Sequence, residues 1–161
     1  MAFLELTMYQ ISGLLLLPVF LVLAALFAYA LFELGRFLFE IMQRRFSART
    51  SKPLTYYYRQ HPQADLEQLE LQVLKKLETL RVVSRVSPML GLIATMIPMG
   101  PALMGVATGD FMSVAENLSA AFSAVIIALL VASIVFWVLS VRRRWLLEEL
   151  KQLIPIVEQE A

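Results

Sequence analysis

Residues 117–141 read NLSAAFSAVIIALLVASIVFWVLSV, which gives 25 residues without a charge between Glu116 and Arg142. Two earlier stretches are also uncharged, 24 residues at 86–109 and 27 residues at 6–32. A helix needs about 20 apolar residues to cross a hydrocarbon core about 30 Å thick. The sequence therefore predicts an all-α membrane protein with three transmembrane helices.

The composition agrees with this prediction. Of the 161 residues, 59% are hydrophobic and 17% are charged, whereas soluble domains carry about 25% charged residues. The alternative, that the three uncharged stretches are buried helices of a soluble protein, fits poorly with a chain of only 161 residues. The first stretch does not resemble a signal peptide, because Glu5 and no Lys or Arg precede it. The lack of cysteine excludes disulfides, thiol nucleophiles and cysteine-bound metals.

The placement of positive charge predicts the orientation. Ten of the fourteen Lys and Arg residues lie between the first and second uncharged stretches. The other four follow the third stretch, at Arg142, Arg143, Arg144 and Lys151. Short cytoplasmic segments of membrane proteins hold such residues. We therefore expect the N-terminus outside and the C-terminus in the cytoplasm.

These boundaries divide the chain into five segments. They are an outer tail with the first transmembrane helix (1–46), a cytoplasmic loop and amphipathic helix (47–85), the second transmembrane helix (86–109), the third (117–141), and a cytoplasmic C-terminal helix (142–161). The second and third spans are expected to be joined by a short outer loop at 105–116.

The cytoplasmic segment has two parts. From Phe46 to Gln63 the chain is rich in Ser, Thr and Pro, which predicts a loop, and its run Tyr56-Tyr57-Tyr58-Arg59 favours an anchor at the membrane interface. We then expect Asp65 to cap a helix that continues into the second span. The apolar stripe of this helix is Leu66, Leu69, Val73, Leu77, Leu80 and Val83. The chain's own helices, including 145–153, or a neighbouring subunit can cover that stripe, and both can do so together.

No span carries an ionisable residue at mid-depth, although membrane proteins that move charge usually hold one there. Glu33 and Arg36 lie at the inner end of the first span and are expected to pair structurally. His61, the only histidine, is expected to be solvated. If the protein moves ions, a partner must supply the titrating group. The sequence predicts no enzyme activity, cofactor, metal site or nucleic-acid site.

Small residues and prolines distinguish the second and third spans from the first, which is rich in Leu and Phe and is expected to face lipid. Small residues permit close approach of helices in membranes, and prolines there need neighbours that satisfy the freed carbonyls. Packing within one subunit alone is not expected to explain so many small residues and prolines on two of the three spans. The pattern therefore favours an oligomer. The residues assigned to helix packing are Gly91, Pro98, Gly100, Pro101, Ala120, Ala124 and Ala128.

Three local motifs then carry a family resemblance. Residues 87–95 read SPMLGLIAT and are similar to the Pro-x-Leu-Gly-Leu-x-Gly-Thr segment that opens the second span of the MotA/TolQ/ExbB family. Residues 117–122, NLSAAF, resemble the start of its third span, and residues 142–145, RRRW, its exit. With the predicted topology, the chain resembles a small ExbB/TolQ-like member over roughly residues 81–150.

The resemblance implies a pentamer in the inner membrane of a prokaryote, with the second and third helices lining a central pore. The pore would hold a single-span partner like ExbD, TolR or MotB, whose aspartate takes and releases the ion. Thr95 matches the family threonine expected to face that aspartate. The usual threonine of the third span is missing, and Ser123 or Ser119 would supply its hydroxyl.

The leading functional prediction is a subunit of an ion-driven, proton-conducting motor that acts through its partner. The alternative is a non-conducting membrane scaffold of the same fold, which anchors the partner. A lone pore-former is a weaker third reading. The short cytoplasmic segments argue against a flagellar motor, since a large cytoplasmic domain is missing.

Overall fold

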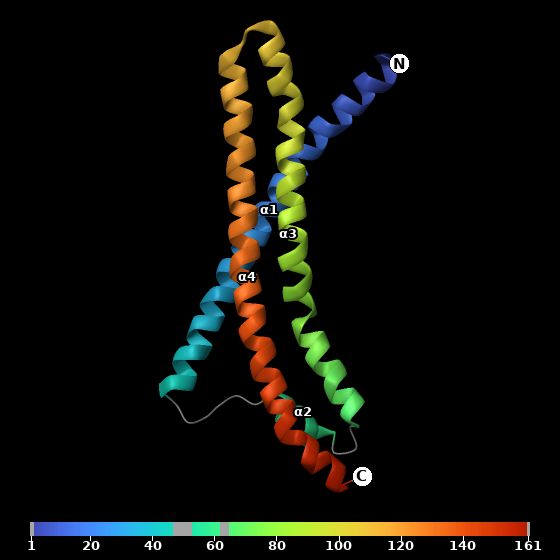
Figure 1. The fold of residues 1–161 in the computed structure, drawn as a ribbon, viewed down its shortest axis with the longest axis vertical. Coiled ribbons are helices and arrows are strands. Elements are labelled where there is room, and N and C mark those ends of the chain that lie inside the picture. The colour runs from blue at the N-terminus through green and yellow to red at the C-terminus, as the bar shows by residue number, and fades with distance from the viewer. Residues whose placement is uncertain (1, 47–52, 62–64, 161) are drawn as a thin grey trace. The chain divides into compact units, whose positions relative to one another are not determined.

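The computed structural model describes the backbone of residues 2–46, 53–61 and 65–160, and side chains within 13–44, 53–61 and 65–157. Four helices account for nearly all of these residues (Figure 1). They are α1 (Ala2–Phe46), α2 (Pro53–Gln60), α3 (Leu66–Thr108) and α4 (Phe111–Glu160). No strand occurs in the described ranges. The all-α prediction is confirmed.

Three of the helices are long and apolar enough to cross a membrane. The qualifying segments are Gly13–Arg44, Leu66–Thr108 and Phe111–Val157. At 1.5 Å per residue, the 43 residues of α3 extend about 65 Å, roughly twice the thickness of a hydrocarbon core. The amphipathic helix and the second predicted span are therefore one continuous helix, as predicted.

The turn between α3 and α4 is shorter than the predicted outer loop. Only Gly109 and Asp110 lie outside the helices, because α3 runs through Thr108 and α4 begins at Phe111. Gly109 has φ 76°, and the Asp110 amide donates to the carbonyl of Gly105 at 2.9 Å. This is the hydrogen bond of a Schellman motif, which favours glycine at the left-handed position. The Asp110 carboxylate then accepts from the Ser113 amide at 3.1 Å and caps α4.

Asp65 precedes the first residue of α3, as predicted. Its carbonyl accepts from the amides of Gln68 and Leu69 at 3.0 and 3.2 Å, and its Oδ1 accepts from the Leu66 amide at 2.7 Å. These bonds satisfy amides at the start of the helix that have no partner within it.

The loop prediction for 46–63 is wrong at residues 53–60, which form α2. Pro53 stands at its first position, where a missing amide hydrogen costs nothing. Tyr58 is buried inside the fold, so the interfacial-anchor reading fails for it, whereas Tyr56 is 65% exposed. An eight-residue helix is not stable alone and depends on tertiary packing, which local sequence does not reveal. The remainder of the predicted loop, 47–52 and 62–63, lies outside the described residues.

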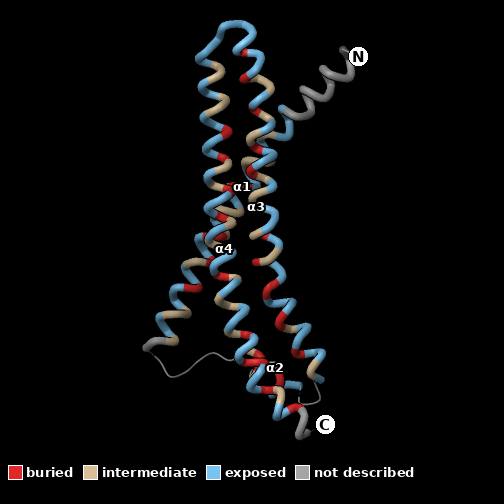
Figure 2. Tube along the Cα trace, in the orientation of Figure 1, coloured by how far each residue is buried: buried red, intermediate tan, exposed pale blue. Residues whose placement is uncertain are grey.

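Two compact units make up the chain. Unit 1 comprises Met1–Leu31 and Val83–Ile134, and unit 2 comprises Phe32–Val82 and Val135–Ala161. Each long helix contributes to both units. On every helix the buried residues follow one face, and the remaining faces are exposed (Figure 2).

The core of unit 2 joins α2, α3 and α4. It contains Leu54 and Tyr58 of α2, with three residues of the predicted stripe, Leu69, Val73 and Leu77. The α4 residues of this core are Leu146, Leu150, Leu153 and Val157. The chain's own helices therefore cover this part of the stripe, which confirms internal packing there.

Candidate functional site

Unit 1 contains a seam of small residues where α1, α3 and α4 meet. Its buried core is Leu23 of α1, Ala94 of α3, and Ala124 and Ala128 of α4. Gly91 also lies in this seam, because a Cβ atom placed there would stand 2.6 Å from the Ala128 Cβ. Such close approach requires small side chains on both helices.

Packing within the chain therefore uses three of the predicted packing residues, Gly91, Ala124 and Ala128. Pro98 is also fully buried. The expectation that internal packing explains the small residues poorly is thus wrong for these positions. Gly100 and Pro101 are only half-buried and Ala120 is exposed, so the structure does not draw them into the seam.

The hydroxyls assigned to the ion pathway lie on α3 and α4 in unit 1. Thr95 is half-buried on α3, one turn beyond Gly91, and its Oγ1 donates to the Leu92 carbonyl at 2.7 Å. Ser119 and Ser123 are exposed on one face of α4, and the Ser123 hydroxyl donates to the Ser119 carbonyl at 2.9 Å. No hydrogen bond within the described residues joins Thr95 to either serine. The Thr95 and Ser123 hydroxyls donate within their own helices, which leaves their oxygens able to accept a further hydrogen bond.

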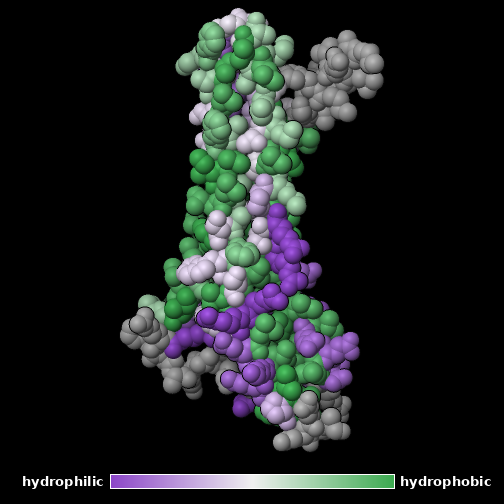
Figure 3. Space-filling view, in the orientation of Figure 1, coloured by the Kyte–Doolittle hydropathy of each residue, from purple (hydrophilic) through white to green (hydrophobic). Residues whose placement is uncertain are grey.

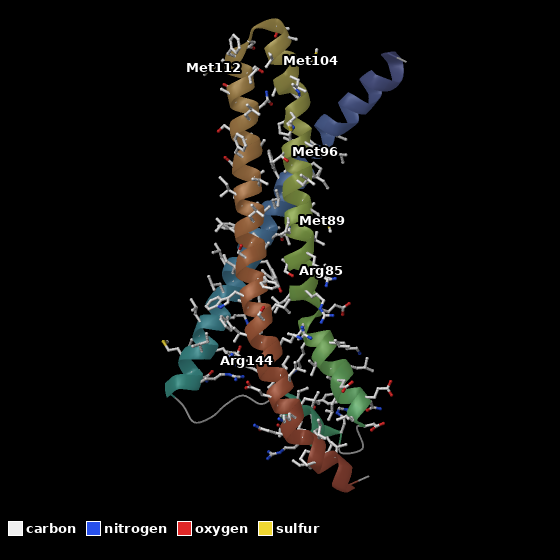
Figure 4. All side chains as sticks on the ribbon, viewed as in Figure 1. Arg85, Met89, Met96, Met104, Met112 and Arg144 are labelled. Atoms are coloured by element: carbon white, nitrogen blue, oxygen red, sulfur yellow. The ribbon has the colours of Figure 1, made fainter. Side chains whose placement is uncertain are left out.

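The outward surface of this hairpin is apolar. Side chains on the exposed face of α3 include Met89, Met96 and Met104, and Met112 extends outward near the start of α4 (Figure 4). Hydrophobic residues make up most of the visible face of the α3–α4 hairpin in unit 1, with a few polar patches among them (Figure 3). This surface suits contact with lipid or with other membrane helices.

Unit 2 holds an ion-pair network that the sequence revealed only in part. The predicted pair is present, with Arg36 3.5 Å from Glu33, but Arg142 of α4 lies closer, with its Nη1 3.1 Å from Glu33 Oε2. Arg142 also lies 3.7 Å from Glu40, which pairs with Arg44 at 3.4 Å. Glu33 Oε2 is buried and makes no hydrogen bond in the described structure, so ion pairing alone compensates its charge.

Aromatic rings pack beside this network. Phe37 meets Trp137 edge-on at 5.3 Å and stacks on Trp145 at 5.6 Å between ring centroids. The guanidinium of Arg44 lies 3.9 Å from the centroid of Trp145, within the range of a cation–π interaction. These contacts hold α1 against α4 inside unit 2.

A buried carboxylate also fixes α2, and sequence reasoning missed it. Glu149 Oε1 accepts from the amides of Leu54 and Thr55 at 2.9 and 2.8 Å, and from the Thr55 hydroxyl at 3.0 Å. An anion at a helix N-terminus satisfies free amides and opposes the helix dipole. Burial lowers the pKa of the nearby Lys76 ammonium, while the charge of Glu149 opposes that shift. The only local sign was an acidic residue at an otherwise apolar face of α4.

We expect Glu149→Ala to lower the free energy of unfolding by about 2 kcal/mol, because hydrogen bonds to a charged group are lost and buried amides stay unpaired. Thermal unfolding in detergent, followed by circular dichroism, measures this loss. Glu148→Ala is the matched control, since that exposed neighbour pairs with Arg144 at 3.8 Å across the helix surface. Equal effects of the two variants would contradict the assigned role of Glu149.

The geometry thus consists of three membrane-length helices, a small-residue seam and hydroxyls on the second and third helices. The model of the MotA/TolQ/ExbB proton channel family matches residues 31–154. No curated protein and no solved structure matches the chain. The matched range includes the last third of α1 and all of α2 and α3, and it reaches into the last turns of α4. The chain therefore belongs to the MotA/TolQ/ExbB proton channel family.

Proposed function

We propose that this chain is one subunit of a proton-driven membrane motor, which couples ion flow to work through a single-span partner like ExbD, TolR or MotB. In this proposal five copies surround the partner in the inner membrane of a prokaryote, with α3 and α4 lining the pore. The N-terminus lies outside and the C-terminus in the cytoplasm, because both Lys- and Arg-rich regions then lie inside.

One observation carries this proposal. Within a family of proton channels, the second and third spans offer hydroxyl oxygens but no carboxylate or imidazole between Arg85 and Asp110, or between Glu116 and Arg142. Proton movement across a membrane needs a group that binds and releases the proton. The partner's acid would be that group, and the free lone pairs of the hydroxyl oxygens would accept hydrogen bonds from it or from water.

Thr95 is the residue we assign to contact with the partner's acid, with Ser123 and Ser119 continuing the pathway on α4. The Thr95 hydroxyl oxygen accepts a hydrogen bond from the partner's protonated acid, while its own hydrogen stays hydrogen-bonded to the Leu92 carbonyl. Gly91, Ala124 and Ala128 hold α3 against α4 at this level of unit 1. Gly100, Pro101 and Ala120 are left to face the pore or the next subunit.

We expect Thr95→Ala to lower ion flux about tenfold, since a hydrogen bond to a charged group contributes roughly 1.5 kcal/mol. The measurement uses vesicles that contain the chain and its partner, with an imposed proton gradient. Thr108→Ala is the matched control, because that threonine lies at the end of the same helix and also donates to carbonyls of its own helix. Absence of flux for the parent protein with its partner would overturn the conducting function.

A non-conducting scaffold remains the second candidate, and the α4 face favours it. Both Ser123 and Ser133 donate back to their own helix, and by the family resemblance the usual third-span threonine is missing. If the protein is a scaffold, the parent protein binds the partner but shows no ion flux. Thr95→Ala then leaves the binding of the partner unchanged. Native mass spectrometry in detergent tests assembly separately, and a stable monomer would contradict both pore and scaffold.

A further inference from the structure

Unit 2 presents two exposed stripes that face away from its core. On α3 the stripe is Glu67, Leu71, Leu74 and Glu78, which we name the acidic stripe. On α4 it is Ser140, Arg144, Leu147 and Lys151, which we name the basic stripe. Both have the spacing four, three, four, so each forms one line along its helix.

The apolar residues of both stripes are left uncovered. Leu71 is 49% exposed, Leu74 48% and Leu147 46%. Leu147 lies within a shallow pocket of about 370 Å³ on α4. Its lining is the basic stripe together with Arg143 and Glu148. The pocket offers an apolar floor with positive charge at both ends, which suits a leucine flanked by carboxylates.

The charged residues of the stripes are available for a partner. Glu67 and Glu78 form no ion pair with another described residue. Arg144 extends outward from α4 (Figure 4), and its contact with Glu148 is a 3.8 Å pair between side chains 70% and 65% exposed. Such surface pairs contribute little and exchange readily. Lys75 lies beside the acidic stripe and reduces its negative charge without cancelling it. Glu148 lies beside the basic stripe and likewise reduces its positive charge only in part.

We propose that the basic stripe of one copy of this chain binds the acidic stripe of a second copy. The inference rests on the oligomer of the proposed function and assigns the surfaces that join its subunits. Because the two stripes differ, the contact is heterologous, and such a contact forms a ring where its repeated rotation closes without translation.

The heights of the stripes within unit 2 fit such a rotation. Leu69 and Val73 share one core with Leu146 and Leu150, so the two stripes lie at the same height along the unit. The helices run antiparallel there (Figure 1), which places Glu67 level with the Lys151 end and Glu78 level with the Arg144 end. The charged residues span about 16 Å on α3 and about 10 Å on α4, a difference that long Arg and Lys side chains cover. A rotation without translation therefore pairs opposite charges and brings the leucines together.

Cysteine cross-linking in membranes tests this contact, because the natural chain has no cysteine. Leu74→Cys and Leu147→Cys are made on separate, differently tagged copies and expressed together. Oxidation is expected to yield a mixed disulfide dimer, at least fivefold above either variant alone. The matched control replaces Leu147→Cys by Ile156→Cys, which is equally exposed but lies on another face of α4.

Charge reversal provides an independent measurement. Glu78→Arg and Arg144→Glu are each expected to weaken association about fivefold per interface, the upper range for an exposed ion pair. The double variant restores assembly, because it exchanges the two charges across the same contact. Native mass spectrometry of the detergent-solubilised protein reports the fraction of assembled subunits.

The outcomes separate this inference from the proposed function. If the parent protein is oligomeric but no mixed disulfide forms, the stripes are not the interface and the inference is wrong, while the motor proposal stands. Strong disulfide formation by either single variant alone indicates a symmetric contact and also overturns it. Protection of Leu147→Cys from a water-soluble thiol reagent without cross-linking would indicate another occupant, such as lipid. A monomeric parent protein would overturn both proposals.

Discussion

Arg142→Ala is expected to lower the free energy of unfolding by about 3 kcal/mol, because it removes the less exposed of the two cations beside the buried carboxylate of Glu33 and leaves only the exposed Arg36 to compensate it. Glu33 is 6% exposed and its Oε2 lies 3.1 Å from the guanidinium of Arg142. The same substitution removes the contact with Glu40 at 3.7 Å. The midpoint of thermal unfolding in detergent measures the loss.

Two further variants make this prediction specific. Arg36→Ala removes the other cation beside Glu33, but that side chain is 60% exposed, so we expect a loss below about 1 kcal/mol. Glu33→Gln in the Arg142→Ala background should recover most of the stability, because it removes the buried charge. If Arg36→Ala and Arg142→Ala lower the free energy of unfolding equally, the burial of the arginine side chain does not determine its contribution to the ion-pair network.

Gly91→Leu is expected to have an effect of similar size in unit 1, about 3 kcal/mol, the upper range for overpacking a close contact. A Cβ atom at residue 91 would stand 2.6 Å from the Ala128 Cβ and 3.5 Å from Val125 Cγ2. Since the Ala128 Cβ is fixed to the backbone, it cannot rotate away. The helices must separate, and the buried contacts of Ala94 and Ala124 weaken with them.

The compensating change identifies the contact. Gly91→Ala alone should destabilise the protein, and adding Ala128→Gly should recover part of the loss by restoring the space. Gly35→Ala is the control, because nothing lies within 4 Å of a Cβ atom at that position. Removing a helical glycine there should raise stability by roughly 0.5–1 kcal/mol. A Gly91→Ala variant as stable as the parent protein would contradict the close approach of α3 and α4.

Several parts of the site were predictable because their signals are local. Asp65 precedes α3 and a stripe at helical spacing follows it, and both features are read from neighbouring residues. The pair Glu33–Arg36 spans one helical turn, so helix geometry alone brings its members together. Seam residues such as Gly91 and Ala128 were identified by size, although the sequence favoured a neighbouring subunit over internal packing.

Other features depend on residues far apart in the chain. Glu149 meets Leu54 across 95 positions, and without that contact the Pro53–Gln60 segment reads as a loop. Arg142 was assigned to topology and to the exit motif of the third span, because nothing local connects it with Glu33. The acidic and basic stripes could be located only after the core of unit 2 showed which faces of α3 and α4 remain exposed.

The sequence by itself determined that this protein is helical and has three membrane-length segments, and its motifs led to the family. These properties follow from uncharged length, since a chain in hydrocarbon must satisfy its backbone polar groups within each helix. Only the tertiary structure decided which small residues form the seam, how Glu33 is compensated, and that Glu149 orders α2. These three features depend on which helix faces meet. The residues along one face of a helix have the same spacing in the sequence whether or not another element covers that face.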